Sequence, residues 1–187
     1  MTYLEMKKKI LSLIEEADDI EKGITNDEDI KNKLPYVINQ IQNELSRIKK
    51  IPAYAEIEVS QDDELTFLDL KKETKDEIYQ LDGIRGAKCE LKAQGTVIKC
   101  LEAGTLEVEY FKYPITINEE TLDEYVFELS NDVLEIMPYG VAADLLKNDT
   151  SNAYGNIYAQ RYEQMKQQLD PRYNLGLMEV EGGIDVF

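Results

Sequence analysis

Hydrophobic positions near the N-terminus repeat with the period of an amphipathic helix. The first apolar stripe consists of Met6, Ile10, Leu13 and Ile14. Thr2 and Glu5 precede this stripe with the spacing of a capping box, in which each side chain accepts a hydrogen bond from the backbone N–H of the other residue. The pattern therefore predicts a helix from about Tyr3 to Ala17.

A second helical pattern follows, and a proline lies inside it. Thr25 or Asn26 can cap its start, and acidic residues occupy the first turn, where a helix N-terminus favours negative charge. Because a proline inside a helix removes a donor and clashes with the preceding turn, we predict a short helix ending near Lys33. A new helix with Pro35 in its first turn then runs to about Lys50. Its apolar stripe is Val37, Ile38, Ile41, Leu45 and Ile48.

From Ile51 the hydrophobic period changes to two, which indicates strands. A turn at Asp62-Asp63 predicts a first hairpin whose pairs are Val59 with Thr66, Ile57 with Leu68, and Ala55 with Leu70. Residues 76–79 favour a helical turn. Gly83-Ile84-Arg85-Gly86 lacks the spacing of a phosphate-binding loop and is interpreted as a turn before the next strand.

A second hairpin is predicted around a turn at Gln94-Gly95. Its pairs are Ala93 with Thr96, Leu91 with Ile98, Cys89 with Cys100, and Glu90 with Lys99. A three-residue turn ending in a left-handed Gly104 then leads into a strand that runs to Pro114. Its inward face is Leu106, Val108 and Tyr110, with Leu106 and Val108 opposite Cys100 and Ile98. The three strands together predict a meander that begins at Ala87.

Helical patterns return after Pro114. Residues 125–129 form a short strand or an extended lead-in, and Ser130 or Asn131 caps the next helical turn. Pro138 is expected to interrupt this segment as Pro35 does, before a helix that ends near Lys147. Thr150 or Ser151 caps a last helix, which ends at Asp170-Pro171. The apolar stripe of that helix is Tyr154, Ile157, Tyr158, Tyr162, Met165 and Leu169.

These elements predict an α+β fold with a discontinuous helical domain. A helical bundle from residues 1–50 and 115–170 holds an inserted antiparallel β meander, residues 51–114, and an extended C-terminal tail covers residues 171–187. The apolar side chains of the tail are Leu175, Leu177, Met178, Val180, Ile184, Val186 and Phe187. They form the candidate interface, because such a segment either docks on its own domain or adds a strand to a neighbouring subunit. If it binds a neighbour, deleting residues 174–187 abolishes assembly and leaves the fold intact.

Charge is unevenly distributed along the chain. The formal net charge is −17, and residues 51–130 carry 19 acidic against 8 basic residues. An acidic field repels phosphate backbones, which argues against tight nucleic-acid binding but allows DNA to pass without sticking. Solubility alone is the alternative explanation. The sequence has no apolar run long enough to cross a membrane and no apolar signal core at its N-terminus, so we expect neither membrane insertion nor secretion.

The residues needed for common catalytic sites are missing. The chain has no histidine, which excludes Ser-His and Cys-His catalysis and histidine-ligated metals. The only two cysteines, Cys89 and Cys100, are expected to be buried reduced thiols rather than a disulfide or a zinc site. The acidic pairs, Asp18-Asp19, Asp62-Asp63 and Glu119-Glu120, are typical of solvated turns. We therefore predict no enzyme activity and no catalytic, cofactor or metal site.

Three stretches carry a family resemblance. They are the N-terminal helix pair with Leu34, Ile38 and Ile41, the strand from Gly104 to Pro114, and the closing helices over residues 137–146 and 152–169. In this order, over residues 2–170, the chain resembles the head-to-tail adaptor (connector) proteins of tailed bacteriophages.

The resemblance implies a virion structural protein of the neck, made in the host cytoplasm and without catalytic residues. It also implies a homo-oligomeric ring, commonly a dodecamer, which docks on the portal protein, meets tail or stopper proteins and continues the DNA channel. Two alternatives stay open: another tail or head-completion protein, and an enzyme that uses paired carboxylates.

Overall fold

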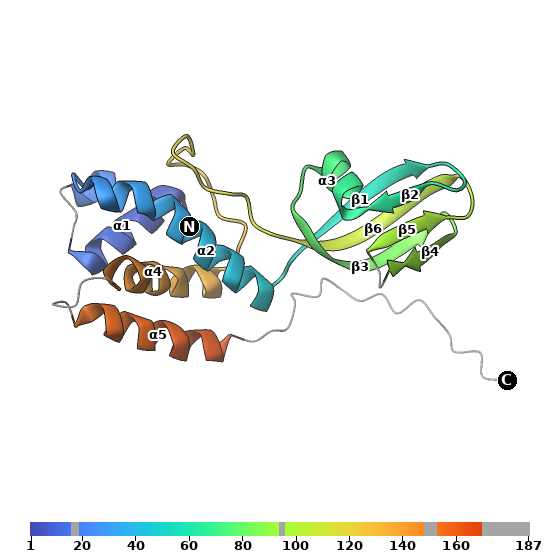
Figure 1. Ribbon diagram of the computed structural model, residues 1–187. Helices are drawn as coiled ribbons and strands as arrows, with labels where there is room; N and C mark the ends of the chain where they lie inside the picture. Colours follow the sequence, from blue (N-terminus) through green and yellow to red (C-terminus); the bar gives the residue numbers. More distant parts are fainter. Residues whose placement is uncertain (16–18, 94–95, 148–152, 170–187) are drawn as a thin grey trace.

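The computed structural model describes residues 1–15, 19–93, 96–147 and 153–169. The fold is α+β, as predicted, and it consists of two bodies that lie end to end (Figure 1). The helical body contains α1 (Tyr3–Ile14), the 3₁₀ helix η1 (Ile20–Lys22), α2 (Glu28–Ile48), α4 (Asn131–Leu146) and α5 (Tyr154–Gln168). The β body contains β1 (Ile51–Val59), β2 (Glu64–Thr66), α3 (Phe67–Thr74), β3 (Ile78–Gly86), β4 (Cys89–Lys92), β5 (Val97–Cys100) and β6 (Gly104–Lys112).

The first helix begins as the sequence predicts. Thr2 Oγ1 accepts a hydrogen bond from Glu5 N (3.2 Å), and Glu5 Oε2 accepts one from Thr2 N (2.8 Å), which completes the capping box. The helix ends earlier than predicted, at Ile14, because Glu15 takes a left-handed conformation with φ of 59°. The cap of α2 is Asp27 rather than Thr25 or Asn26, and its carboxylate accepts hydrogen bonds from the N–H groups of residues 29 and 30.

The two prolines do not divide the helices, which corrects the prediction. Pro35 lies within the continuous helix α2, and Pro138 lies within α4. A proline inside a helix costs about 3 kcal/mol, since one backbone hydrogen bond is lost. Both prolines are buried together with their apolar neighbours, and this tertiary packing offsets the lost bond.

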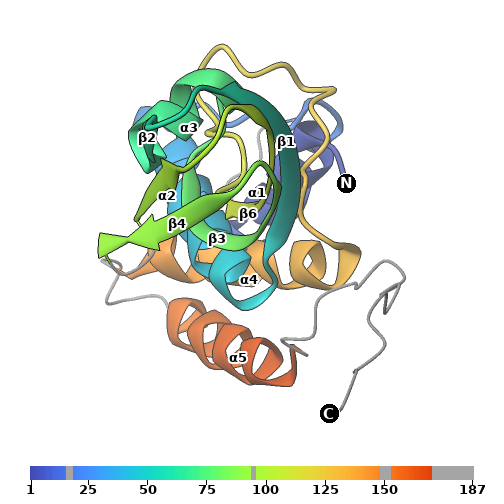
Figure 2. The ribbon, with the colours of Figure 1, turned by 90° about the vertical axis from the view of Figure 1, so that its right-hand side faces the viewer.

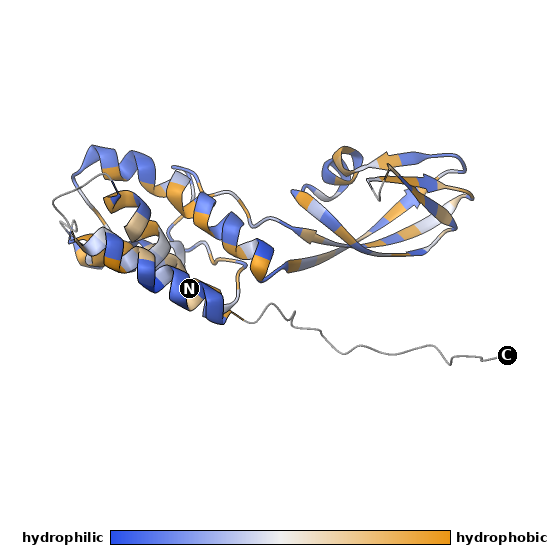
Figure 3. Ribbon diagram, turned by 60° about the horizontal axis from the view of Figure 1, so that its bottom comes forward, coloured by the Kyte–Doolittle hydropathy of each residue, from blue (hydrophilic) through white to orange (hydrophobic). Residues whose placement is uncertain are grey.

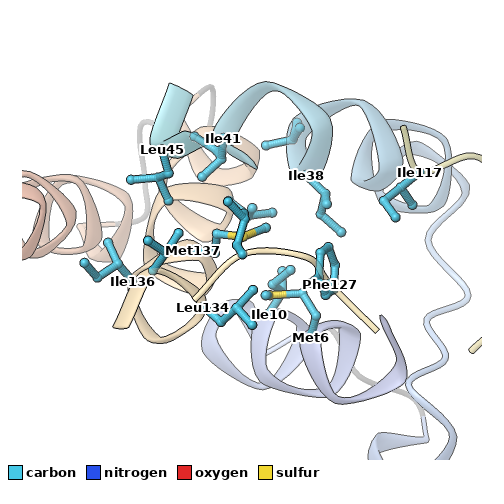
Figure 4. Close-up of a cluster of buried hydrophobic side chains, with 14 of the residues drawn as sticks. Met6, Ile10, Ile38, Ile41, Leu45, Ile117, Phe127, Leu134, Ile136 and Met137 are labelled. Atoms are coloured by element: carbon cyan, nitrogen blue, oxygen red, sulfur yellow. The ribbon is translucent and has the colours of Figure 1, made fainter. Parts of the chain in front are cut away.

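A large hydrophobic core holds the helical body together (Figure 4), and a smaller cluster of Leu11, Ile14 and Ala142 lies beside it. Helix α4 packs against α1, α2 and α5, so it is the central helix. The core side chains labelled in Figure 4 are Met6, Ile10, Ile38, Ile41, Leu45, Ile117, Phe127, Leu134, Ile136 and Met137. Gly140 permits close contact between α4 and α5, because a Cβ there would lie 2.8 Å from the Tyr162 ring.

The β body consists of two three-stranded antiparallel sheets with the strand orders β1-β6-β3 and β2-β5-β4. Polar and apolar positions alternate along the strands (Figure 3). The sheets curve around one interior (Figure 2), and their buried side chains form a second core that is separate from the helical one. The fully buried members of this core include Leu70, Ile98, Cys100, Leu106 and Val108.

The first predicted hairpin is wrong. Strand β1 pairs with β6, with Ile57 opposite Leu106, instead of pairing with residues 66–70. Those residues begin a helix, because Thr66 and Asp69 form a second capping box at the start of α3. Leu70 is buried from that helix, while Leu68 is 62% exposed.

The second predicted hairpin is confirmed in its register. Strands β4 and β5 pair Cys89 with Cys100, Glu90 with Lys99, and Leu91 with Ile98. The predicted turn residues 94–95 lie outside the described residues.

The expected meander is wrong, although its third strand exists. Strand β6 buries Leu106, Val108 and Tyr110 as predicted, but it pairs with β1 and β3 rather than with β5. The three residues between Cys100 and Gly104 carry the chain from one sheet to the other. Strands β5 and β6 therefore lie in different sheets and contribute side chains to the same core, instead of pairing side by side.

The segment before β4 also differs from the prediction. Neither a helical turn over residues 76–79 nor a turn at residues 83–86 forms, since residues 78–86 make up strand β3. Gly86 ends that strand with φ of 88°, and a Cβ there would lie 2.3 Å from the carbonyl oxygen of Thr105. A glycine is therefore required by the close approach of β6.

The chain returns from the β body through an extended segment, one of the two forms predicted for residues 125–129. Val126 makes an isolated antiparallel bridge with Thr2, and Ser130 is the N-cap residue of α4. The proposed caps of the last helix, Thr150 and Ser151, lie outside the described residues, and α5 begins at Tyr154. Its predicted apolar stripe is only partly covered, because Tyr162 and Leu169 are buried while Tyr154 and Ile157 are exposed.

Candidate functional site

The tail residues predicted as an interface, Leu175, Leu177, Met178, Val180, Ile184, Val186 and Phe187, lie outside the described residues. Within the described ranges, none of the helices is long and apolar enough to cross a membrane. Among the same residues, no three Asp, Glu, Cys or His side chains come together in a way that could hold a metal ion. The candidate functional features of the described residues lie on the surfaces of the two bodies and at their junction.

The acidic pairs have structural roles where they are described. Asp63 Oδ2 accepts a hydrogen bond from Ser60 N (2.7 Å) in the turn after β1. Asp19 caps η1 by accepting one from Lys22 N (3.2 Å). Glu119 and Glu120 are exposed in a turn in which Asn118 Oδ1 accepts from Glu120 N. These arrangements stabilise turns, as the sequence predicts, and bring no two of these pairs together.

Four glutamates share the outer face of the sheet β1-β6-β3, and we call this set the carboxylate face: Glu56, Glu58, Glu107 and Glu109. The register places Glu56 directly opposite Glu107, and Tyr54 opposite Glu109. Side chains that are directly opposite in an antiparallel pair lie about 5 Å apart at Cβ. The inner faces of the same strands are buried, so these carboxylates point away from the core.

The electrostatics of the carboxylate face are unfavourable. Like charges that are directly opposite destabilise a sheet. Arg85 Nη2 lies 3.5 Å from Glu109 Oε1 and compensates part of the charge. Tyr54 donates a hydrogen bond to Glu56 Oε1 (2.7 Å), and this bond, with burial and the surrounding carboxylates, raises the pKa of Tyr54 to about 12. The phenol therefore stays neutral at physiological pH.

A cluster of charged side chains links the β body to the helical body through ion pairs. Lys112 Nζ, at the end of β6, lies 3.0 Å from Asp76 Oδ1 and 2.7 Å from Glu128 Oε1. Tyr110 donates to the other oxygen of Asp76 (2.8 Å), and Glu128 Oε2 accepts from the backbone N–H of Ile115 (2.9 Å). Burial alone would lower the pKa of Lys112, but its hydrogen bonds to Glu128 and Asp76 outweigh burial and raise that pKa.

A second set of contacts at the same junction involves aromatic side chains. Tyr79 of β3 donates to the carbonyl oxygen of Ser46 in α2 (3.1 Å). Its ring lies 4.7 Å from that of Tyr113, whose hydroxyl accepts from Arg47 Nε (3.0 Å). The junction is thus fixed by side chains from both bodies, and the carboxylate face has a defined orientation relative to the helices.

The helical body carries a groove of about 630 Å³ over α4, between α1 and α5. Among the described residues, its charged lining includes Lys8, Lys9 and Arg161 and the acidic residue Glu135. Its apolar lining includes Leu13, Ile20, Tyr139 and Met165. We call it the basic groove, because three cations around one site are unusual in a chain with 38 acidic and 21 basic residues.

The sequence analysis identified the acidity of the central segment. It did not identify the carboxylate face, the charged cluster at the junction or the basic groove. The carboxylate face depends on the pairing of β1 with β6, whose residues are about fifty positions apart. The local signals are the alternation of Glu56 and Glu58, and of Glu107 and Glu109, with more buried residues, which places each pair on one outer face of its strand. The junction cluster and the basic groove combine residues from three or more distant elements, and no spacing rule connects them.

Comparison with known proteins adds no constraint. No protein-family model matches the chain, and a search of curated proteins finds no match.

Proposed function

We propose that this chain is a virion structural protein: a ring-forming head-to-tail adaptor that docks on the portal of a tailed bacteriophage and extends the DNA channel toward the tail. The proposal has two supports. One is the resemblance to head-to-tail adaptor proteins in the order of the helical and strand patterns over residues 2–170. The other is the carboxylate face, which is the observation that carries the channel role.

The carboxylate face suits a surface along which DNA slides. Nucleic-acid affinity rests on Lys and Arg that displace counterions from phosphates. The carboxylate face has four carboxylates beside one cation, Arg85, which is near Glu109, so it attracts phosphates weakly. The face also keeps Glu56 opposite Glu107 at a cost in stability, which is expected of residues retained for function rather than for folding. In the proposed ring, each subunit contributes one such face to the lumen.

The contacts at the junction of the two bodies support the same role. In a ring that continues a channel, the part of each subunit that lines the lumen must have a fixed position relative to the part that docks on neighbouring proteins. The cluster of Lys112, Asp76 and Glu128 links the end of β6 to the segment that leads into α4. We assign docking to the helical body and channel lining to the β body.

The test is the mass of the protein in solution, alone and mixed with portal rings from the genome that encodes it. We expect a discrete complex with the portal that contains several copies of the chain, visible as a ring by electron microscopy. Absence of association at both low and high salt would reject the adaptor role. A ring whose lumen is neutral or basic would reject the channel-lining role of the carboxylate face while leaving the adaptor role intact.

A further inference from the structure

The basic groove combines an apolar interior with a cationic rim. Helix α4 forms its floor with Pro138 and Tyr139, and α1 and α5 form its walls. Apolar side chains line the interior, with Ile20 53% exposed. The cations Lys9 and Arg161 are exposed, and Lys8 is half-buried. A ligand that fills this groove would bury apolar groups against α4 and place carboxylates near the cations.

We propose that the basic groove is the docking site of the chain's own C-terminal segment, residues 170–187. Apolar and acidic residues alternate in this segment, with Glu179 and Glu181 on either side of Val180. The whole segment carries four acidic residues against one basic residue, Arg172. This composition complements a groove with an apolar interior and a cationic rim. The inference is independent of the proposed adaptor function, since it concerns a single subunit.

Geometry favours docking within the same subunit. Met165 lines the groove, and the described part of the chain ends only four residues later, at Leu169. Ten extended residues span about 33 Å, whereas the 15 residues of α5 span about 22 Å, so the segment can turn back along the whole helix. A segment tethered this close has an effective concentration of about millimolar, which favours it over an untethered competitor.

The available cations strengthen the assignment. Arg161 stacks on Tyr139, with its guanidinium carbon 4.4 Å from the ring centre, and this contact holds the charge over the groove. Among the described residues, Lys8 Nζ has an ion-pair contact with Glu21 Oε2 at 4.0 Å, which is at the limit of an ion pair. Incoming carboxylates from residues 179 and 181 would therefore meet cations that are already in place.

The experiment uses the natural absence of tryptophan from the chain. Leu177→Trp and, in a second full-length protein, Phe187→Trp each provide a single fluorescent reporter in the segment. We expect at least one reporter to show blue-shifted emission and protection from acrylamide quenching, because a docked indole leaves water. Full exposure of both reporters in otherwise unchanged protein overturns the proposal.

The dependence on the groove is tested by charge reversal in the protein with the protected reporter. Lys8→Glu combined with Lys9→Glu, and separately Arg161→Glu, should give several-fold stronger quenching and a red-shifted emission. The matched control is Lys71→Glu with Lys72→Glu, an equal charge change on α3 in the β body. Equal effects of the control and the groove variants overturn the proposal. Circular dichroism establishes that each variant is folded before it is compared.

Two further measurements identify the occupant. Added salt should increase quenching in the parent more than in the Lys8/Lys9 variant, because screening weakens charge pairing. Protection should not change with protein concentration when the segment docks in its own subunit. Protection that grows with concentration, together with dimer formation, would identify the segment of a second copy as the occupant and overturn docking within one subunit.

Discussion

Two cysteines show how far single residues can be placed from sequence. The pairing of Cys89 with Cys100 was predicted from the hairpin pattern, and the register confirms it. Both are free thiols in the structure. Cys100 is fully buried as expected, but Cys89 is only partly buried, because it lies in β4 at the edge of its sheet. Pairing within one hairpin is a local problem, because the turn fixes the register and alternation fixes the face.

The state of these thiols leads to a first prediction. Burial raises the pKa of both thiols, and for Cys100 the nearby Cys89 and Asp63 raise it further, so little reactive thiolate exists at pH 8. We expect slow reaction with a thiol reagent in the native protein, and rapid reaction of two thiols after unfolding without reductant. Finding no reactive thiol in the unfolded protein would mean that the two cysteines form a disulfide.

Lys112 is a residue whose role the sequence could not reveal, since its partners lie 36 and 16 positions away. Its side chain is only 14% exposed between two carboxylates. We predict that Lys112→Met lowers the free energy of unfolding by about 2–3 kcal/mol, because Asp76 and Glu128 lose their cation in a half-buried site. Chemical denaturation measures this change.

The comparison for Lys112→Met is Lys147→Met, which removes a more exposed ion pair with Asp144 and should change stability by less than about 0.5 kcal/mol. The raised pKa of Lys112 means that its contribution is complete below the unfolded pKa of about 10.4 and is lost only as pH rises through the folded value. The difference between parent and variant should therefore be equal at pH 7 and pH 9. Equal losses from the two substitutions would contradict a special role for the junction cluster.

At the scale of elements, the hydrophobic period predicted most helices, but residues 66–70 and residues 76–86 were misassigned. Residues 64–74 contain the alternation of a strand over their first half and a capping box at Thr66 and Asp69. The helix formed because strand β1 pairs with the longer strand β6, so residues 67–74 have no strand pairing with β1. The sequence analysis divided helices α2 and α4 at their prolines, because helix propensities include the cost in stability of a proline inside a helix. They do not include the burial of Pro35 and Pro138, which offsets that cost.

The second capping box leads to a prediction about α3. Thr66→Ala should lower the free energy of unfolding by about 1 kcal/mol, since the N–H of residue 69 loses its acceptor. Hydrogen bonds from the Thr66 side chain, and then from Lys72, lower the pKa of Asp69 to about 2. The contribution of a lowered carboxyl pKa is present above the unfolded value of about 3.9 and is lost as pH falls through the folded value.

The effect of Thr66→Ala should consequently be largest at neutral pH and shrink between about pH 4 and pH 2. Thr74→Ala, in the last turn of the same helix, removes a hydroxyl that donates to the carbonyl oxygen of Leu70 and accepts from the backbone N–H of Asp76. It serves as the comparison because its titrating neighbour, Tyr110, has a pKa that burial raises to about 12 and does not titrate in this acid range. A Thr66→Ala effect that is constant over this pH range would show that Asp69 is not coupled to the cap.

At the scale of the molecule, the sequence predicts the class of fold and the β4–β5 hairpin, but not the pairing of the other strands. Alternation places Leu106 and Val108 on an inner face, yet several registers satisfy this condition equally well. The choice of β1 and β3 as the partners of β6 depends on closing two sheets around one core, which is a non-local condition. The carboxylate face arises from this choice, and so no local pattern could have assembled it.

The proposed channel role gives the last prediction, because the placement of the acidic residues matters more than their number. Replacing Glu56, Glu58 and Glu107 by Lys should make a portal-bound assembly bind duplex DNA, with a slope of log affinity against log salt of about −3 for each subunit that contacts the DNA. The control replaces Glu119, Glu120 and Glu124 by Lys, which changes net charge equally on an exposed loop of the helical body. Fluorescence anisotropy of labelled DNA at low and high salt separates the two. If both triple variants bind DNA equally, net charge alone governs contact and the carboxylate face does not line the channel.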